Sequence, residues 1–194
     1  MSEPSDPISR FAAAFQEATR PDLPESTAFV LATTGADGKP SARVVLLKAF
    51  DDRGFVFYTN LESRKAKELM AVRHAALCFY WPLLKQQVRV EGSVERISDG
   101  EADAYFATRP RGAQIAAWAS KQSTPLTSRL NLEKKFMAFQ QEYSGREVPR
   151  PRFWSGFRVI PERMEFWEFR EDRLHERTLY TRDNGRWVMQ NLYP

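Results

Sequence analysis

Apolar and polar residues alternate with the two-residue period of β-strands over much of the chain, and segments with helical spacing separate these runs. Strands are expected where such a run is bounded by glycine, proline, asparagine or aspartate. The sequence predicts strands at 28–33, 41–50, 55–59, 75–81, 87–95, 157–160, 164–167, 177–181 and 187–190. The last two form a hairpin about Asp183-Asn184-Gly185, because Asn-Gly is favoured in tight turns.

Helices are predicted before and between these strands. Ile8 and Phe11 share one face of a helix over 7–19, and Pro21 and Pro24 end it. Further helices are predicted over 63–72, 98–108 and 113–120, and from about 132 to 145. Short antiparallel connections dominate, so we expect a barrel-like α+β fold with helices inserted between strands. No repeat or linker divides residues 1–194, which we interpret as a single domain.

Composition and charge narrow the function classes. The 194 residues are 42% hydrophobic, and no apolar run approaches the ~20 residues of a membrane span. Without an apolar signal region and with Cys78 as the one cysteine, a cytoplasmic protein is expected. The net charge of +4 favours anionic partners. Basic residues are interleaved with acids and form no nucleic-acid motif, so small phosphorylated ligands suit the charge better than nucleic acid.

The stretch from 43 to 69 holds the first candidate anion site. Ser63 is placed to be the N-cap of the following helix, and Arg64 and Lys65 fall in its first turn. Cations there oppose the helix dipole unless an anion offsets them. Free N–H groups with an arginine and a lysine suit a phosphate, although a solvated basic helix start is the alternative.

Two further groups of residues point to anions. Tyr105 and Arg109 are four apart on one predicted helix and project together, as a second phosphate site or a surface cation–aromatic contact. If 173–177 is extended, Arg173, His175 and Arg177 share one face, as an anion site or an exposed strand end.

The remaining chemistry is sparse. Arg43 and Lys48 are an odd number apart on one predicted strand and reach one ligand only if the strand bulges or the ligand straddles its edge. His74 and His175 are the two histidines, and with a single cysteine they predict no metal site.

These residues lie in stretches that together resemble the pyridoxamine 5'-phosphate oxidase family. The matching stretches are RVVLLK, FVFYTN-x-x-SRKAKEL, QVRVEGSVER, YFATRPRGAQIAAWASKQS, VPRPRFWSGFRV, EFW and RLHER. They follow the family's order and spacing from about residue 28 to the C-terminus. The resemblance implies a split β-barrel that forms a homodimer and binds FMN at the subunit interface.

The resemblance also implies roles for individual residues. The cofactor-binding set is Arg43, Val44, Val45, Leu46, Lys48, Tyr58, Thr59, Arg64, Lys65, Gln87, Gln122, Ser123, Trp167 and Arg177. The substrate-binding set is Lys48, Tyr105, Arg109, Arg173 and His175, of which Arg173 and His175 hold the substrate against the flavin.

The function implied is oxidation of pyridoxamine or pyridoxine 5'-phosphate to pyridoxal 5'-phosphate, with oxygen as electron acceptor and hydrogen peroxide released. A related flavin oxidase acting on a phenazine precursor and a non-catalytic FMN or pyridoxal phosphate binding protein are the alternatives. Two departures stand out. The family commonly has a serine where this chain has Ala113, and the chain begins close to its first helix, so how the substrate is covered is left open.

Overall fold

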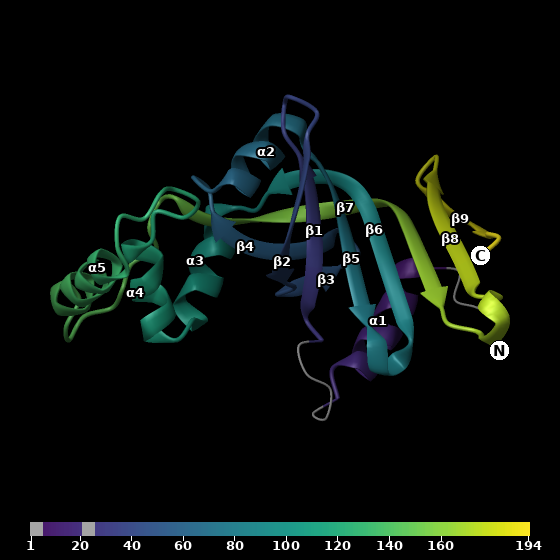
Figure 1. The fold of residues 1–194 in the computed structure, drawn as a ribbon, viewed down its shortest axis with the longest axis horizontal. Helices are drawn as coiled ribbons and strands as arrows, with labels where there is room; N and C mark the ends of the chain where they lie inside the picture. The colour runs from purple at the N-terminus through teal and green to yellow at the C-terminus, as the bar shows by residue number, and fades with distance from the viewer. Residues whose placement is uncertain (1–5, 21–25) are drawn as a thin grey trace.

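The computed structural model describes residues 6–20 and 26–194, so Pro21 and Pro24 lie outside the described residues. A strongly curled antiparallel sheet forms the body of that part, and helices flank it (Figure 1). The elements are α1 Pro7–Ala18, β1 Ala28–Thr34, β2 Pro40–Leu46, β3 Ala49–Asp51, β4 Gly54–Asn60, α2 Arg64–Val72, β5 His74–Trp81, η1 Pro82–Leu84, β6 Gln86–Arg96, α3 Asp99–Thr108, α4 Arg111–Ala119, α5 Arg129–Glu142, β7 Trp154–Glu168, η2 Glu171–Arg173, β8 Glu176–Asp183 and β9 Arg186–Asn191.

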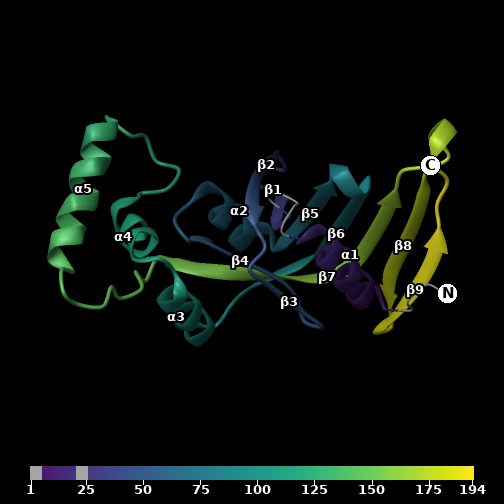
Figure 2. The ribbon, with the colours of Figure 1, turned by 90° about the horizontal axis from the view of Figure 1, so that it is seen from below.

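The expected α+β class with helices between strands is confirmed. The strand order is β2-β1-β5-β6-β7-β4-β3, with β8 added on β7 and β9 on β8. The first half of β7 pairs with β4 and its second half pairs with β8, so one long strand joins two regions. Figure 2 shows the β8–β9 hairpin at one end of the molecule and helices α3, α4 and α5 at the other.

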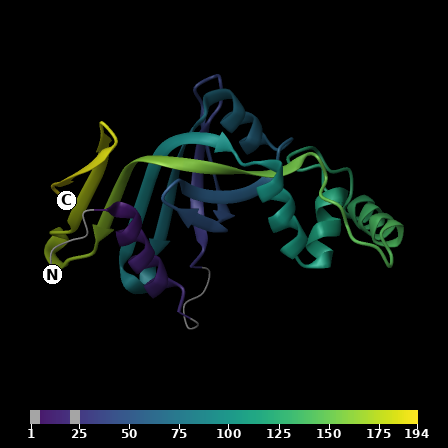
Figure 3. The same ribbon diagram turned by 180° about the vertical axis from the view of Figure 1, so that it is seen from behind.

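The main core lies inside the curled sheet, with α1 packed across it (Figure 3). Asp6 caps α1 by accepting hydrogen bonds from the backbone N–H groups of Ile8 and Ser9. Phe11 is fully buried, with its ring 4.8 Å from that of Phe55 and 5.0 Å from that of Phe79. The predicted helix over 7–19 is therefore confirmed, and its apolar face closes the core.

The prediction of one strand over 41–50 is wrong, because the chain changes partners inside it. Leu47 is buried and its N–H donates to the carbonyl oxygen of Thr27 beside β1. The N–H of Lys48 donates to the carbonyl oxygen of Val56 in β4. The strand thus divides into β2, paired with β1, and β3, paired with β4.

The prediction of separate strands at 157–160 and 164–167 is also wrong, since both belong to β7. The proline and charged residues between them suggest a break, but a register shift opposite Glu91 and Gly92 absorbs the extra residue as a bulge. A Cβ at Gly92 would lie 1.9 Å from the carbonyl oxygen of Ile160, so only glycine fits there.

Candidate functional site

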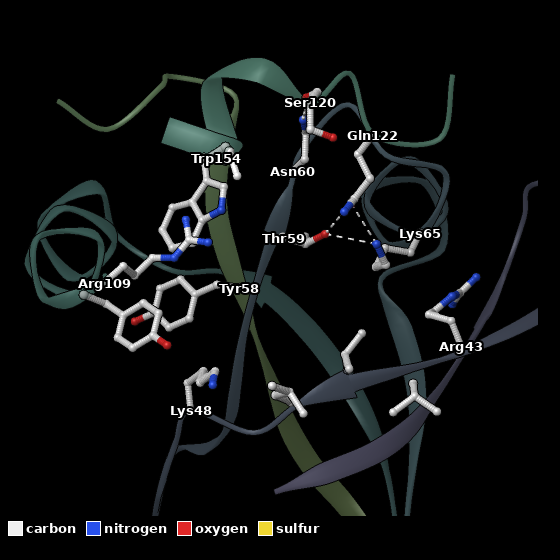
Figure 4. A pocket seen from close by; sticks show the side chains of 16 residues that line it. Arg43, Lys48, Tyr58, Thr59, Asn60, Lys65, Arg109, Ser120, Gln122 and Trp154 are labelled. Carbon is white, nitrogen blue, oxygen red and sulfur yellow. Dashed lines mark hydrogen bonds between the residues drawn. The ribbon is translucent and has the colours of Figure 1, made fainter. Parts of the chain in front are cut away.

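A cavity of about 420 Å³ opens where β2 and β4 meet α2, α3 and α4 (Figure 4). It is lined by Arg43, Val44, Val45, Leu46, Lys48, Tyr58, Thr59, Asn60, Lys65, Tyr105, Arg109, Ala116, Ala117, Ser120, Gln122 and Trp154. Four of these side chains are cationic and none is a carboxylate. The cavity therefore suits an anion.

The change of partner between β2 and β3 brings Arg43 and Lys48 to the same cavity. Strict alternation would place them on opposite faces of one strand. Because the chain leaves β2 after Leu46 and turns toward β4, Lys48 reaches the cavity from the connection. The strand does not need to bulge, and the conflict noted in the sequence disappears.

The first turn of α2 supplies one of the cationic side chains of the cavity, Lys65. Ser63 caps the helix by accepting a hydrogen bond from the N–H of Ala66, as the sequence predicts. The Nζ of Lys65 donates to Oε1 of Gln122 at 2.9 Å and to Oγ1 of Thr59 at 3.2 Å. Burial lowers the pKa of Lys65, and the nearby charge of Arg43 lowers it further. A bound anion would relieve both effects.

Arg64 behaves differently from its neighbour. It does not line the cavity, its side chain is 66% exposed, and its Nε donates to Oε1 of Glu68 at 2.8 Å. Arg64 therefore stands at the edge of the site and is held there by a carboxylate from its own helix.

Stacked aromatic rings and an arginine form the opposite wall. The ring of Tyr58 stacks 4.0 Å from that of Tyr105 and 5.2 Å from that of Trp154. The guanidinium of Arg109 lies over the Trp154 ring, 4.7 Å from its centroid (Figure 4). Its Nη1 is buried and has no hydrogen-bond partner among residues 6–20 and 26–194, and burial lowers the pKa of this arginine. A buried, unpartnered guanidinium nitrogen calls for an acceptor from a ligand.

Five of the predicted site residues lie away from this cavity. Gln87 pairs with Trp167 across β6 and β7, and Trp167 pairs with Arg177 across β7 and β8. Residues directly opposite one another in antiparallel strands share a face. The ring of His175 lies 4.7 Å from that of Trp167. Arg173 and His175 lie in the connection between β7 and β8, next to the β8–β9 hairpin, and Figure 1 shows this hairpin far along the molecule from α3 and α4.

The expectation of an extended run through 173–177 is wrong. Arg173 ends the short helix η2 with a φ of 61°, and β8 begins only at Glu176. Arg173 therefore does not share a strand face with Arg177. His175 is placed instead by a hydrogen bond from the backbone N–H of Arg170 to its Nδ1, at 3.2 Å.

Ser123 lies outside the main cavity, and several residues that line the cavity were not predicted. Ser123 lines a neighbouring cavity of about 460 Å³, and Gln122 lines both cavities. The cavity residues that the sequence reasoning missed are Asn60, Ala116, Ala117, Ser120 and Trp154. Trp154 had a signal, because it lies in the matching stretch VPRPRFWSGFRV and a tryptophan is a common partner for an arginine.

In the part of the chain that is described, no helix is long and apolar enough to cross a membrane. Within the same residues, no cluster of histidine, cysteine, aspartate and glutamate could hold a metal ion.

Two family models match the sequence. Residues 15–143 match the model described as pyridoxamine 5'-phosphate oxidase, and residues 154–194 match the pyridoxine 5'-phosphate oxidase C-terminal dimerisation region. A protein from Myxococcus xanthus strain DK1622 called pyridoxine/pyridoxamine 5'-phosphate oxidase is 58% identical over 98% of this chain and 93% of its own. One of the same name from Rubrobacter xylanophilus is 56% identical over 97% of this chain and 87% of its own.

Solved structures share the fold. PhzG from Burkholderia lata 383, in complex with tetrahydrophenazine-1-carboxylic acid, has a TM-score of 0.95 at 33% identity, over 100% of this chain and 95% of that one. A pyridoxamine 5'-phosphate oxidase-related, FMN binding protein from Nostoc punctiforme has a TM-score of 0.77 at 20% identity, over 97% of this chain and 98% of that one. The second likeness concerns the fold alone.

Proposed function

The chain belongs to the pyridoxamine 5'-phosphate oxidase family, and we propose that it oxidises pyridoxamine and pyridoxine 5'-phosphates to pyridoxal 5'-phosphate. FMN is its cofactor, oxygen is the electron acceptor, and hydrogen peroxide is released. The observation that carries the proposal is the buried Nη1 of Arg109, which has no partner within the described residues and belongs to a side chain that lines a cavity without carboxylates.

The residues present fit FMN. A phosphate suits the cationic side, where Lys65 and Arg43 lie close enough for one charge to lower the pKa of the other. Thr59 and Gln122 already accept hydrogen bonds from Lys65 and hold its ammonium group in place. The backbone of β2 between residues 43 and 46 supplies the adjoining wall.

The substrate's phosphate is assigned to the other side of the cavity. Arg109 is the binding group there, because its planar guanidinium can donate two parallel hydrogen bonds to phosphate oxygens. Trp154 supports the guanidinium from one face, and Tyr105 and Lys48 border the same space. With alanine at 113, where the family commonly has serine, Arg109 carries more of the phosphate binding in this chain.

Bound FMN supplies the redox chemistry, which is hydride acceptance from the substrate's exocyclic carbon and reoxidation by oxygen. The chain's own residues bind and orient. Arg109 fixes the phosphate end of the substrate, while Arg173 and His175 hold its ring against the flavin. The stacked rings of Tyr58, Tyr105 and Trp154 form one apolar wall of this space.

A homodimer is part of the proposal, because Arg173 and His175 directly precede the β8–β9 hairpin, which lies at the opposite end of the molecule from α3 and α4 (Figure 2). Val30, Val44 and Tyr80 are exposed on the outer face of the sheet, at 40%, 65% and 59%. The pairing register places Val44 next to Val30 and Tyr80 next to Gln87 on this face, which continues to Trp167. Packing this face against a second copy would cover the apolar residues. It would also bring Arg173 of the partner subunit and His175 of the partner subunit to the cavity.

Structural similarity to PhzG favours a second candidate, oxidation of a reduced phenazine carboxylic acid. That ligand carries a carboxylate in place of a phosphate, and either anion can accept hydrogen bonds from Arg109. The phosphorylated substrate is preferred because the relatives named pyridoxine/pyridoxamine 5'-phosphate oxidase are 56–58% identical to this chain, against 33% for PhzG.

The test is turnover by the FMN-loaded protein. We expect pyridoxamine 5'-phosphate to give pyridoxal 5'-phosphate and hydrogen peroxide in equal amounts. Pyridoxamine without its phosphate is the matched control, and kcat/KM should be at least about 100-fold lower for it, since a charge-assisted phosphate site is left empty. Faster turnover of a reduced phenazine carboxylic acid than of the phosphate substrate would favour the second candidate. Absence of turnover with retained FMN would indicate a binding protein.

A further inference from the structure

A buried carboxylate lies directly behind the cationic side of the cavity. Glu68 is in the middle of α2, its side chain is 9% exposed, and it does not line the cavity itself. Its Oε1 accepts a hydrogen bond from Nε of Arg64 at 2.8 Å. Its Oε2 accepts from Oγ1 of Thr33 at 2.5 Å, from Oγ of Ser41 at 2.6 Å, and from Nη2 of Arg43 at 3.3 Å. One carboxylate thus joins α2 to β1 and β2.

The guanidinium of Arg43 is fixed by this arrangement. Its Nη1 donates to the carbonyl oxygen of Leu31 at 3.2 Å and to Oγ1 of Thr33 at 2.5 Å. Its Nη2 donates to Oγ of Ser41 at 2.5 Å and to Glu68. All four N–H groups of its two Nη atoms are therefore engaged within the wall. Arg43 can offer the cavity its charge and its Nε–H, in one orientation.

The carboxylate remains charged in this environment. Burial by itself would raise the pKa of Glu68, but the hydrogen bonds from Ser41, Thr33 and Arg64 outweigh it and lower the pKa to about 2. A charged Glu68 is paired with two guanidinium groups, and Lys65 adds a third cation nearby. The net local charge stays positive. The carboxylate can therefore fix the orientation of the cationic side chains without removing the positive charge that attracts an anion.

We propose that Glu68 is a positioning residue for the cofactor's phosphate, which acts by holding Arg43 and Arg64 on its two carboxylate oxygens. The inference rests on the proposed function, because it takes the cationic side of the cavity as the FMN phosphate site. Glu68 touches neither the cavity nor any reacting atom. Its effect reaches the cofactor through the two arginines, and it concerns the phosphate and not the flavin ring.

The experiment compares two ligands that differ by that phosphate. Apo-protein with Glu68, Glu68→Gln or Glu68→Ala is titrated with FMN and with riboflavin, and the ratio of the two Kd values is measured. Glu68→Ala should weaken FMN binding about 10- to 100-fold, because several charge-assisted contacts lose their anchor. Riboflavin affinity should change less than about twofold, since it has no phosphate to position.

Two variants serve as internal checks. Glu68→Gln keeps the shape and one acceptor oxygen, so the FMN-to-riboflavin preference should fall by a smaller factor than in Glu68→Ala. Glu62→Ala removes an exposed carboxylate just before α2 and should leave the preference unchanged. If Glu68→Ala does not fold, the preference of Glu68→Gln decides, and a value equal to that of the unmodified protein overturns the proposal.

The other outcomes are equally decisive. Equal weakening of FMN and riboflavin in Glu68→Ala means that Glu68 only stabilises the fold, and tighter FMN binding means that its charge repels the phosphate. Either result overturns the positioning role. An unmodified protein that binds riboflavin as tightly as FMN overturns the cofactor site itself, which is a failure of the proposed function and separate from that of Glu68.

Discussion

The two groups of predicted site residues differ in how their charges are balanced. In the cavity, Lys65 contacts neutral acceptors, and Nη1 of Arg109 has no partner in the part of the chain that the structure describes. Beside the β8–β9 hairpin, Nε of Arg177 donates to the buried carboxylate of Glu165 at 2.8 Å, and its Nη2 forms an ion pair with the same oxygen at 2.8 Å. Among the described residues, the cavity cations Lys65 and Arg109 thus have no carboxylate partner, while Arg177 in the hairpin group is paired with Glu165 where it meets the sheet.

This difference indicates that the two groups have different roles. The cavity has the properties of a binding site for phosphates. In the hairpin group, the ring of His175 packs against that of Trp167. Under the proposed function, neither group is a complete active site in one chain. Joining them needs a second copy, so the comparison can be tested by damaging each group separately.

The largest expected effect comes from the cavity, where Arg109 has no carboxylate partner among the described residues. Arg109→Ala should lower kcat/KM for pyridoxamine 5'-phosphate about 10- to 150-fold, because it removes a charge-assisted contact of roughly 1.5–3 kcal/mol. FMN affinity should barely change. Steady-state kinetics at saturating FMN, paired with FMN titration of the apo-variant, measure the two effects separately.

Two other arginines serve as comparisons for that variant. Arg64→Ala should weaken FMN first and lose activity as a consequence. Arg111→Ala is the matched control, because its guanidinium bonds backbone carbonyls at the end of α5 and not the cavity. If Arg109→Ala loses FMN but keeps kcat/KM at saturating cofactor, the assignment of the two phosphate sites is wrong.

A smaller effect, but a more specific one, follows from combining the two groups. Arg109→Ala and His175→Ala should each be impaired alone. After the two are unfolded together and refolded in equal amounts, activity should recover to about a quarter of that of the unmodified protein. Half of the dimers are then mixed, and each mixed dimer has one intact site. Each variant refolded alone is the control, and no gain on mixing would place both residues in the same chain's site.

The sequence predicts the local features of this site well and its assembly poorly. The capped start of α2, with Lys65 in its first turn, and the joint projection of Tyr105 and Arg109 depend on neighbours within a few residues. The position of Lys48 depends on a change of strand partner, and that of Arg173 on a positive φ in η2. Hydrogen bonds between distant segments decide both, and no local pattern encodes them.

Glu68 is a second residue whose environment could not be predicted from local sequence. It follows Arg64 by four residues in a segment rich in lysine, a pattern typical of an exposed helical ion pair. Its burial results from β1 and β2 packing over α2, with Thr33 and Ser41 as donors. A charged residue whose partners come from three elements is recognised only once the elements are placed.

The smallest expected effect is a pH dependence of FMN binding that arises in the cavity. The pKa of Lys65 is lowered in the free protein by burial and by Arg43, and a bound phosphate should raise it again, because an anion favours the ammonium form. Binding then favours protonated Lys65. FMN affinity should be independent of this group below its lowered pKa and should fall as pH rises through it, by at most about tenfold per unit. Lys65→Arg keeps its charge throughout this range, so its Kd for FMN between about pH 8 and 10.5 should stay flatter. Equal slopes for the two proteins would show that Lys65 does not carry the charge that the phosphate meets, and phosphate binding would then depend on Arg43 and Arg64.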